Sequence, residues 1–266
     1  MSQIGETIRH LDLFAGCGGF SRAIELTTTQ IITTQFVEID PDAQKVLKDH
    51  YHHIPIHSDA RNYSPSKGEF DLITSGIPCT GTSTAGTRTG LDHEESALFR
   101  EVLRVLWEGK PKFSIIEQPL GIVTRGLRAI LGGLRMVGYE SEYQVVSAQE
   151  LGAGHKRERL FIISYPYGQF GNLPTSWNQQ VGDVVTRQRA NSQWLTAKRD
   201  RLRTDSGFSF QLVSGSCTPT EHTTDWFTCP THTPGRIRAR KLAGRTVTPA
   251  QAAVAIERVL YLNSLL

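Results

Sequence analysis

Residues 11–20 read LDLFAGCGGF. The apolar run that begins at Ile8 predicts a buried strand, and a helix is expected from Gly19, so the glycines lie in a turn from strand to helix. Such a turn lets a ligand approach the backbone and meet the N-terminus of the helix. The spacing Gly16-x-Gly18-Gly19 differs from the dinucleotide pattern Gly-x-Gly-x-x-Gly. By itself, a glycine turn does not identify the ligand.

Strand and helix patterns alternate from Ile8 to about Tyr165, which predicts an α/β domain with a mostly parallel sheet. The predicted strands are Ile8–Ala15, Thr33–Ile39, Phe70–Ser75, Phe113–Glu117, Ser141–Ser147 and Leu160–Ser164. The predicted helices are Gly19–Leu26, Pro41–His50, Ser96–Glu108 and Gly126–Met136. A last helix is expected from Pro249, a residue that suits a first helical turn.

The composition of the sequence changes from Tyr167 to about Arg240, where polar residues, Gly, Pro and Arg dominate and apolar periodicity is weak. This pattern indicates a small irregular second domain or a long functional insertion. We therefore expect a first domain at residues 1–165, a second at 166–240, and a segment at 241–266 that returns to the first.

The positive charge is concentrated in one segment. Val185 to Arg245 contains 11 Lys and Arg against 4 Asp and Glu, a formal charge of +7, whereas the whole chain has +3. A basic segment on an otherwise mildly acidic protein favours a polyanion partner, nucleic acid first, although a solvated surface would have the same composition.

The chain has 266 residues, 38% of them hydrophobic, which is enough for one large core. It has no run of 18 apolar residues and no signal-peptide stretch near its start, so we expect a cytoplasmic protein without a membrane partner. Its four cysteines are then expected to be reduced. We expect a monomer.

Two acidic residues follow strands in the first domain. Glu38 ends the second strand, where a carboxylate can bind ribose hydroxyls. Asp59 follows a further apolar stretch and could reach an adenine amino group. Together with the glycine turn they favour a nucleoside cofactor over ordinary turn residues.

Cys79 follows the strand Phe70–Ser75 in the loop SGIPCTGTSTAG. A free cysteine is most often a small buried hydrophobe, but ligands of open α/β sheets bind at this edge, and the loop position is typical of a nucleophile. Glu117 ends another buried strand at the same edge, where burial tends to raise the pKa of a carboxyl and lets it donate a proton. Arg157 and Arg159 lie two residues apart at the start of a strand, so they share one face and suit an anion or a carbonyl oxygen.

These motifs, in this order, resemble the DNA cytosine-5 methyltransferase family over most of residues 8–164 and the last 25 residues. DLFAGCGGF resembles the first family motif, and GIPCTGTSTAGTRTGLDHEESALF the fourth, which contains the Pro-Cys nucleophile. IIEQP stands in place of Glu-Asn-Val, LGAGHKRERLFII in place of the Gln-Arg-Arg-x-Arg signature, and KLAGRTVTPAQAAVAI in place of the Gly-Asn motif and closing helix. The resemblance implies a Rossmann-like α/β methyltransferase domain with a small irregular target-recognition domain, of restriction–modification or phage type.

The resemblance also implies the chemistry. Cys79 would add to C6 of a cytosine flipped out of double-stranded DNA, and Glu117 would hydrogen-bond or protonate N3 of that base. Arg159 would hold the O2 carbonyl, and Arg157 would hold the adjacent phosphate or loop. S-adenosylmethionine would be the cofactor. The expected cofactor-binding residues are Phe14, Ala15, Gly16, Gly18, Gly19, Glu38, Ile39, Asp59, Pro78, Leu98, Arg245 and Thr246.

One departure from the family pattern suggests a second cofactor. Arg245 replaces the family Asn beside the cofactor's methionine part. A guanidinium about 5 Å from the sulfonium would repel it by about 3 kcal/mol at an effective dielectric constant of about 20. A carboxylate on the transferred carbon, as in carboxy-S-adenosylmethionine, would match the guanidinium fork. The alternative hypothesis is therefore that the product is 5-carboxymethylcytosine. The plainer reading is that Arg245 swings out to a phosphate or solvent and ordinary methylation proceeds.

The segment 166–240 fills the place of the target-recognition domain and supplies KRDRLR and RIRARK. These basic side chains can contact phosphates, and Arg can read guanine. Cys217, His222, Cys229 and His232 could bind Zn²⁺, but their spacing is not a familiar one, and we predict no metal. Two other functions stay open, a tRNA cytosine-5 methyltransferase and a catalytically inactive DNA-binding protein.

Overall fold

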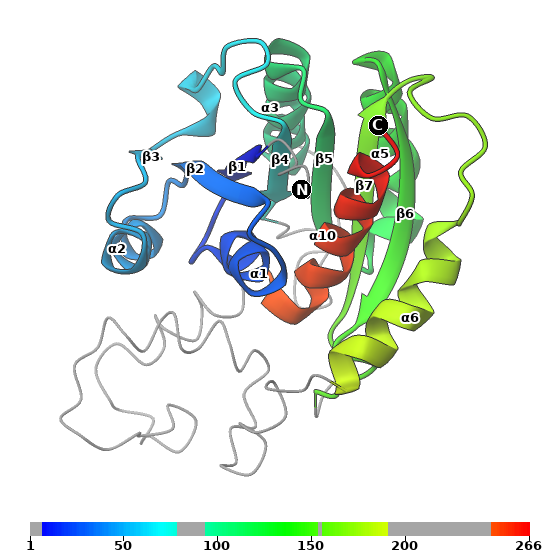
Figure 1. Ribbon diagram of the computed structural model, residues 1–266. Coiled ribbons are helices and arrows are strands. Elements are labelled where there is room, and N and C mark those ends of the chain that lie inside the picture. Colours follow the sequence, from blue (N-terminus) through cyan, green and yellow to red (C-terminus); the bar gives the residue numbers. More distant parts are fainter. Residues whose placement is uncertain (1–6, 79–93, 154–155, 191–245) are drawn as a thin grey trace, which may run out of the picture.

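The computed structural model describes residues 7–78, 94–153, 156–190 and 246–266. Its described strands form one seven-stranded sheet in the order β3-β2-β1-β4-β5-β7-β6 (Figure 1). β7 runs antiparallel to β5 and β6, and the other neighbouring strands are parallel. The strands are β1 (Ile8–Leu13), β2 (Ile31–Val37), β3 (Ile56–His57), β4 (Leu72–Gly76), β5 (Phe113–Pro119), β6 (Tyr139–Ser147) and β7 (Glu158–Pro166).

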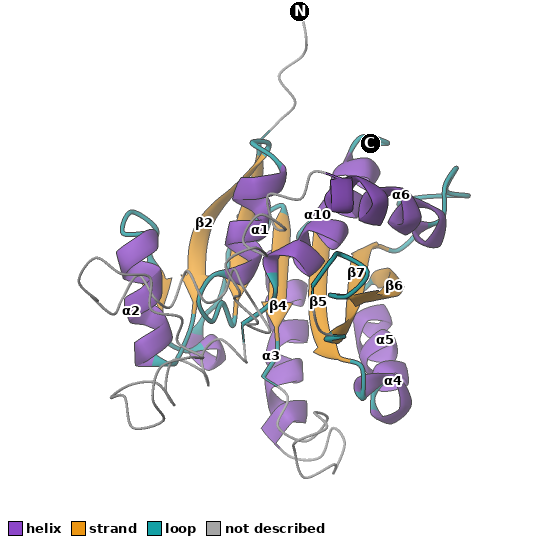
Figure 2. Ribbon diagram, turned by 90° about the horizontal axis from the view of Figure 1, so that it is seen from below, coloured by secondary structure: helices purple, strands orange, loops and turns teal. Residues whose placement is uncertain are grey.

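Helices cover both faces of the sheet (Figures 1 and 2). One face is covered by α1 (Gly19–Thr27), α6 (Trp177–Ala190) and α10 (Pro249–Asn263). The other is covered by α3 (Glu94–Gly109), the short α4 (Ile122–Arg125) and α5 (Leu127–Met136). At the β3 edge, α2 (Pro41–His50) packs on β2, and the short 3₁₀ helix η1 (Ala60–Asn62) follows β3. This layered arrangement is the Rossmann-like α/β fold that the sequence predicted.

Burial on both faces explains the composition of the central strands. In β5 the first six of seven residues are buried, so its apolar run is continuous instead of alternating. Charged and amide side chains appear only at its end, where Glu117 and Gln118 precede Pro119. In β5 the charged and amide side chains are therefore at its carboxyl end.

All six predicted strands are present, with shifted ends. The strand predicted as Ile8–Ala15 ends at Leu13, because Phe14 has a φ of 57° and turns the chain out of the sheet. β2 begins at Ile31, two residues before the predicted start. The predicted helices are also present. Four short or weakly patterned elements were not predicted, namely β3, η1, α4 and α6.

The expectation of an irregular segment after Tyr167 is wrong for residues 177–190, which form α6. Trp177, Val181 and Val184 of this helix are buried in the same core as α10. Only one face of α6 is apolar. The rest of the helix is polar, so the apolar periodicity of this segment is too weak to indicate a helix from the sequence. The division into domains at residue 166 stays a prediction, because residues 191–245 lie outside the described part of the chain.

A buried arginine joins α10 to α6 and β6. Arg258 is fully buried, and its guanidinium donates to both carboxylate oxygens of Glu142 at 2.7 and 2.9 Å. It also donates to the carbonyl of Thr175 at 3.0 Å and to the side chain of Gln180 at 2.9 Å. The buried charge is thereby both paired and hydrogen-bonded, as burial requires.

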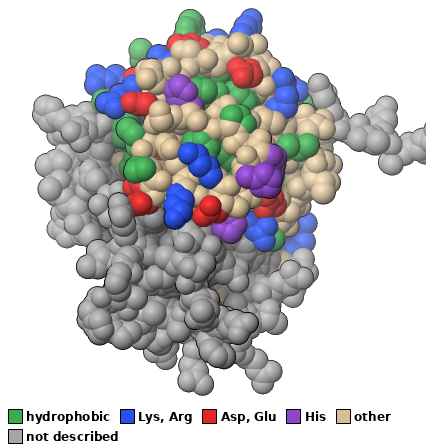
Figure 3. Space-filling model, turned by 90° about the vertical axis from the view of Figure 1, so that its left-hand side faces the viewer, with side chains coloured by type: hydrophobic (Ala, Val, Ile, Leu, Met, Phe, Trp, Pro, Cys, Tyr) green, Lys and Arg blue, Asp and Glu red, His purple; other side chains and the backbone are tan. Residues whose placement is uncertain are grey.

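On the β3 and α2 side, the described surface mixes acidic, basic and histidine side chains (Figure 3). This described face shows no broad single-sign patch. The basic charge predicted to meet a polyanion falls mostly on residues 191–245, outside the described part. Among the helices that the structure describes, none combines the length and hydropathy that a membrane span needs.

Candidate active site

The glycine turn predicted from the sequence connects β1 to α1. Phe14, Gly16 and Gly18 have φ values of 57°, 56° and 79°, in the left-handed region that glycine adopts most easily. The amide of Ala15 still donates to the carbonyl of Val37 at 3.1 Å, so the turn starts at the edge between β1 and β2. α1 then begins at Gly19, and Gly18 before it provides no side-chain cap.

The C-terminal segment lies directly on this loop. A Cβ at Gly19 would come within 2.2 Å of the Val247 carbonyl oxygen, and a Cβ at Gly16 would lie 3.6 Å from Oγ1 of Thr246. Thr246 is buried there. Two segments 230 positions apart in the chain thus form one wall, which explains why Gly19 has to lack a side chain. Arg245 precedes this wall and lies outside the described residues.

Glu38 lies next to the loop at the end of β2. Its carboxylate accepts from the amide of Gly16 at 2.7 Å and from the amide of Asp40 at 2.7 Å. Burial raises the pKa of Glu38, and these amides oppose the rise. Ile39 beside it is 60% exposed, although it is a large apolar side chain. A fixed carboxylate next to an exposed apolar side chain fits the ribose and base of a nucleoside.

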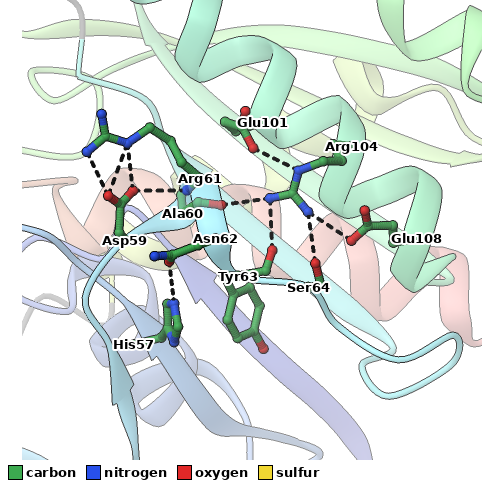
Figure 4. A network of polar contacts seen from close by, with 10 residues as sticks. All are labelled: His57, Asp59, Ala60, Arg61, Asn62, Tyr63, Ser64, Glu101, Arg104 and Glu108. Atoms are coloured by element: carbon green, nitrogen blue, oxygen red, sulfur yellow. Dashed lines mark hydrogen bonds and ion pairs between the residues drawn. The ribbon is translucent and has the colours of Figure 1, made fainter.

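Asp59 lies in the loop between β3 and η1 (Figure 4). Its carboxylate accepts from the Arg61 backbone amide at 3.0 Å and forms an ion pair with the Arg61 guanidinium at 2.6 Å. Hydrogen bonds from Arg61 lower the pKa of Asp59, which keeps this partly exposed acid charged. It remains an acceptor on the same edge of the sheet as Glu38.

Glu117 and the two arginines meet at the carboxyl edge of the sheet. Glu117 pairs with Gly76 of β4 across the ladder, and its Oε1 lies 2.9 Å from Nε of Arg159 on β7. Arg157 donates through Nη2 to the carbonyl of Thr246 at 2.9 Å. Burial raises the pKa of Glu117, and the charges of Arg159 and Arg157 oppose the rise. The expectation of a raised carboxyl pKa at this position is confirmed.

Cys79 lies outside the described residues, so the structure does not place its thiol. Its loop leaves β4 after Gly76, and Pro78 is exposed. Phe14 and Leu98, two other expected cofactor contacts, are half-buried against the same apolar cluster. The structure therefore brings most expected cofactor residues and the Glu117–arginine group to one edge of the sheet.

Several buried polar residues near the site were missed. Asp12 in β1 accepts from Ser21 at 2.9 Å and from Thr74 at 3.0 Å, and Thr74 also bonds His10 at 2.8 Å. An acid and a histidine inside an apolar strand were the available signal. Arg104 and Gln251 were also missed, because the carbonyl groups that they bind are distant in the chain.

No group of three or more His, Cys, Asp or Glu in the described residues could hold a metal ion. The zinc candidates Cys217, His222, Cys229 and His232 lie outside those residues, so the absence of metal stays a prediction.

Comparison with known proteins agrees with this geometry. The sequence profile described as C-5 cytosine-specific DNA methylase matches residues 8–200. The chain belongs to this family. The Type II methyltransferase M.CviJI of Paramecium bursaria Chlorella virus IL3A is 36% identical over 161 residues, 59% of this chain and 43% of that protein. M.HpaII of Haemophilus parainfluenzae is 31% identical over 191 residues, 68% of this chain and 52% of that protein.

Solved structures support the fold of this family member. The S. pombe Dnmt2 methyltransferase superposes with a TM-score of 0.53 at 20% identity, covering 67% of this chain and 55% of that one. A putative DNA modification methyltransferase encoded within an E. coli prophage has a TM-score of 0.50 at 23% identity, covering 60% and 47%. The family member described here spans less than two thirds of the length of the first relatives that it matches.

Proposed function

We propose that this protein transfers a methyl group from S-adenosylmethionine to C5 of a cytosine in double-stranded DNA, through a covalent bond between Cys79 and C6. The observation that carries the proposal is the buried Glu117 beside Arg159 and Arg157, at the same sheet edge as the glycine loop and Glu38. An acid whose pKa is raised by burial can donate a proton to N3 of the base. Family membership supports the same reaction.

The residues present fit the cofactor. Glu38 offers carboxylate oxygens for the ribose hydroxyls, Ile39 offers an exposed apolar surface for the base, and Asp59 offers an acceptor for the amino group. Phe14 and Gly16 in the glycine loop are only partly buried, so the backbone there can be approached by a ligand. When bound, S-adenosylmethionine supplies an electrophilic methyl group on a sulfonium.

The protein groups then act on the base in sequence. Protonation or hydrogen bonding at N3 by Glu117 makes the ring accept the Cys79 thiolate at C6, which breaks the C5–C6 π bond and sends its electron pair to C5. Arg159 holds the O2 carbonyl during this step. After C5 has formed its bond to the methyl carbon, loss of the C5 proton to a base expels the thiolate and restores the double bond. The base must leave the helix to reach these groups.

The test uses DNA with 5-fluorocytosine, in which the C5 fluorine cannot leave as a proton. Wild type should form a denaturation-resistant adduct, and Cys79→Ser should form none while it still binds DNA. Nucleoside mass spectrometry of DNA and tRNA from expressing cells identifies the substrate. Modified tRNA without modified DNA would contradict the DNA assignment, and an unmodified pool with no adduct would indicate an inactive DNA-binding protein.

The DNA contact is proposed to lie in the basic segment. Replacement of Lys198, Arg199, Arg201 and Arg203 by Ala should weaken DNA binding and lower the log–log salt slope by about 0.9 for each lost phosphate contact. An unchanged slope would locate the DNA elsewhere on the protein. The relatives named Type II methyltransferases favour a restriction–modification or viral setting and a cytoplasmic location, which we propose for this chain.

Arg245 favours a second candidate cofactor, carboxy-S-adenosylmethionine. The next residue, Thr246, lies against Gly16 of the cofactor loop. A guanidinium next to that loop would pair with a carboxylate on the transferred carbon. With both cofactors at equal concentration, wild type should make 5-carboxymethylcytosine, and Arg245→Asn should shift the product to 5-methylcytosine. Only 5-methylcytosine from wild type, or an unchanged ratio in the variant, would exclude this candidate.

A further inference from the structure

Arg104 of α3 uses all five of its guanidinium donors (Figure 4). Nε donates to Glu101 at 2.8 Å, and Nη1 donates to Glu108 at 2.9 Å and to Ser64 Oγ at 3.3 Å. Nη2 donates to the carbonyl oxygens of Ala60 and Tyr63 at 2.7 and 2.8 Å. The two glutamates on its own helix hold the guanidinium plane, and the remaining donors bind the loop that follows β3.

That loop carries Asp59, whose carboxylate is bound by Arg61 of the same loop, but the loop's two backbone–backbone hydrogen bonds are long. The amide of Asn62 reaches the Asp59 carbonyl at 3.3 Å, and the amide of Tyr63 reaches the Ala60 carbonyl at 3.4 Å. Bonds of this length are weak. The shorter, charge-assisted bonds from Arg104 are therefore the stronger restraint on the peptide next to Asp59.

Arg104 also connects this loop to the helix that carries another expected cofactor contact, Leu98. Leu98 lies on the same helix and packs against the apolar cluster that includes Phe14. The guanidinium thus connects the helix that carries Leu98 to the loop that carries Asp59. One side chain from outside the site therefore links two segments that carry expected cofactor contacts.

We propose that Arg104 is a positioning residue that determines the adenine specificity of the cofactor site. This inference rests on the proposed function, in which Asp59 accepts a hydrogen bond from the adenine amino group. Hypoxanthine has a carbonyl oxygen at that position, and a carboxylate held opposite it would repel it. If the loop is released, Asp59 can move away from the base, and adenine and hypoxanthine become equivalent.

The experiment measures binding of S-adenosylhomocysteine and S-inosylhomocysteine by calorimetry. Wild type should prefer the adenosine form by about tenfold or more, the factor expected for one lost hydrogen bond and the repulsion that replaces it. Arg104→Met should reduce this ratio to near one, and Arg104→Lys should give an intermediate ratio. Arg100→Met is the matched control on an exposed position of the same helix, and it should keep the wild-type ratio.

The ratio separates positioning from general support of the fold. Equal loss of affinity for both ligands in a folded Arg104→Met variant, with the preference kept, would overturn the proposal. If that variant does not fold, the double variant Glu101→Gln, Glu108→Gln releases the guanidinium more gently, and it too should lower the ratio. Wild type that binds neither ligand would contradict the proposed function itself, and wild type that binds both equally would contradict the role of Asp59 on which the inference rests.

Discussion

Arg157 and Gln251 hold each other's segments in place. The Arg157 side chain donates to the carbonyl of Thr246 at 2.9 Å, and the Gln251 side chain donates to the carbonyl of Arg157 at 2.7 Å. Gln251 is fully buried and also donates to the carbonyl of Val146 at 2.8 Å. The entry into β7, which carries the arginines that face Glu117, is thereby attached to the segment that lies on the glycine loop.

Gln251→Leu should slow single-turnover methyl transfer by about tenfold, since the carbonyl groups of Val146 and Arg157 each lose a donor and Arg157 loses its support. Affinity for S-adenosylhomocysteine should change much less. Because the charge of Arg157 lowers the pKa of Glu117, a displaced Arg157 should move the alkaline limb of the pH–rate profile to higher pH. Gln144→Leu, at a half-buried position of β6, is the control. A wild-type rate and profile in Gln251→Leu would contradict the prediction.

Arg159→Met should destabilise the protein in a pH-dependent manner. The variant leaves the buried Glu117 carboxylate without its closest charge, at a cost of about 3 kcal/mol. Because the folded pKa of Glu117 is already above its unfolded value, stability from this group is present at low pH and lost as pH rises through the folded pKa. Removing Arg159 raises that pKa further, so the deficit in urea unfolding should be largest at pH 8 and shrink toward pH 5. The added change Glu117→Gln should abolish this pH dependence, and a deficit independent of pH in Arg159→Met alone would count against the ion pair.

Gly19→Ala should disrupt the wall of the cofactor loop. The added Cβ would lie 2.2 Å from a backbone oxygen of Val247, which cannot move without displacing Thr246. We expect a loss of about 2 kcal/mol in unfolding free energy and a drop of at least about tenfold in cofactor affinity. Gly132→Ala in α5 is the matched control, since its Cβ would meet nothing within 4 Å, and it should stabilise by about 0.5–1 kcal/mol. Normal cofactor affinity in Gly19→Ala would show that the two segments separate easily.

Asp12→Asn should remove a pH dependence of stability. Burial raises the pKa of Asp12 to about 7, so the folded state keeps a proton that the unfolded chain releases near pH 4. The wild type should therefore lose stability from about pH 4 to pH 7, by about 4 kcal/mol in total. The Asn variant should match wild type at the acidic end and exceed it at pH 8 in urea unfolding. Asp49→Asn, exposed on α2, should follow wild type; parallel curves for wild type and Asp12→Asn would refute the raised pKa.

Local sequence was sufficient to predict the helices and strands that have a strong apolar periodicity or a strong turn signal beside them. The strand, glycine turn and helix around LDLFAGCGGF were predicted because each signal lies within a few residues. Glu117 was predicted at the carboxyl edge because it ends a buried run. Arg159 was predicted only at the start of a strand, and it meets Glu117 because β7 runs antiparallel to β5. The two-residue β3 and the partly polar α6 have no such signal, and both were missed.

The amino-acid sequence alone determined the α/β class and the family motifs, and it supplied the catalytic side chains that we propose, since these depend on residue type and short spacing. The tertiary structure alone decided how the side chains are held. Arg104 reaches carbonyl groups more than 40 positions away, and Gln251 reaches one 94 positions away. The backbone carbonyls that these side chains bind are the same in every residue type and leave no mark in the sequence. Only the folded chain brings donor and acceptor together, and a buried polar group without its partner would be costly.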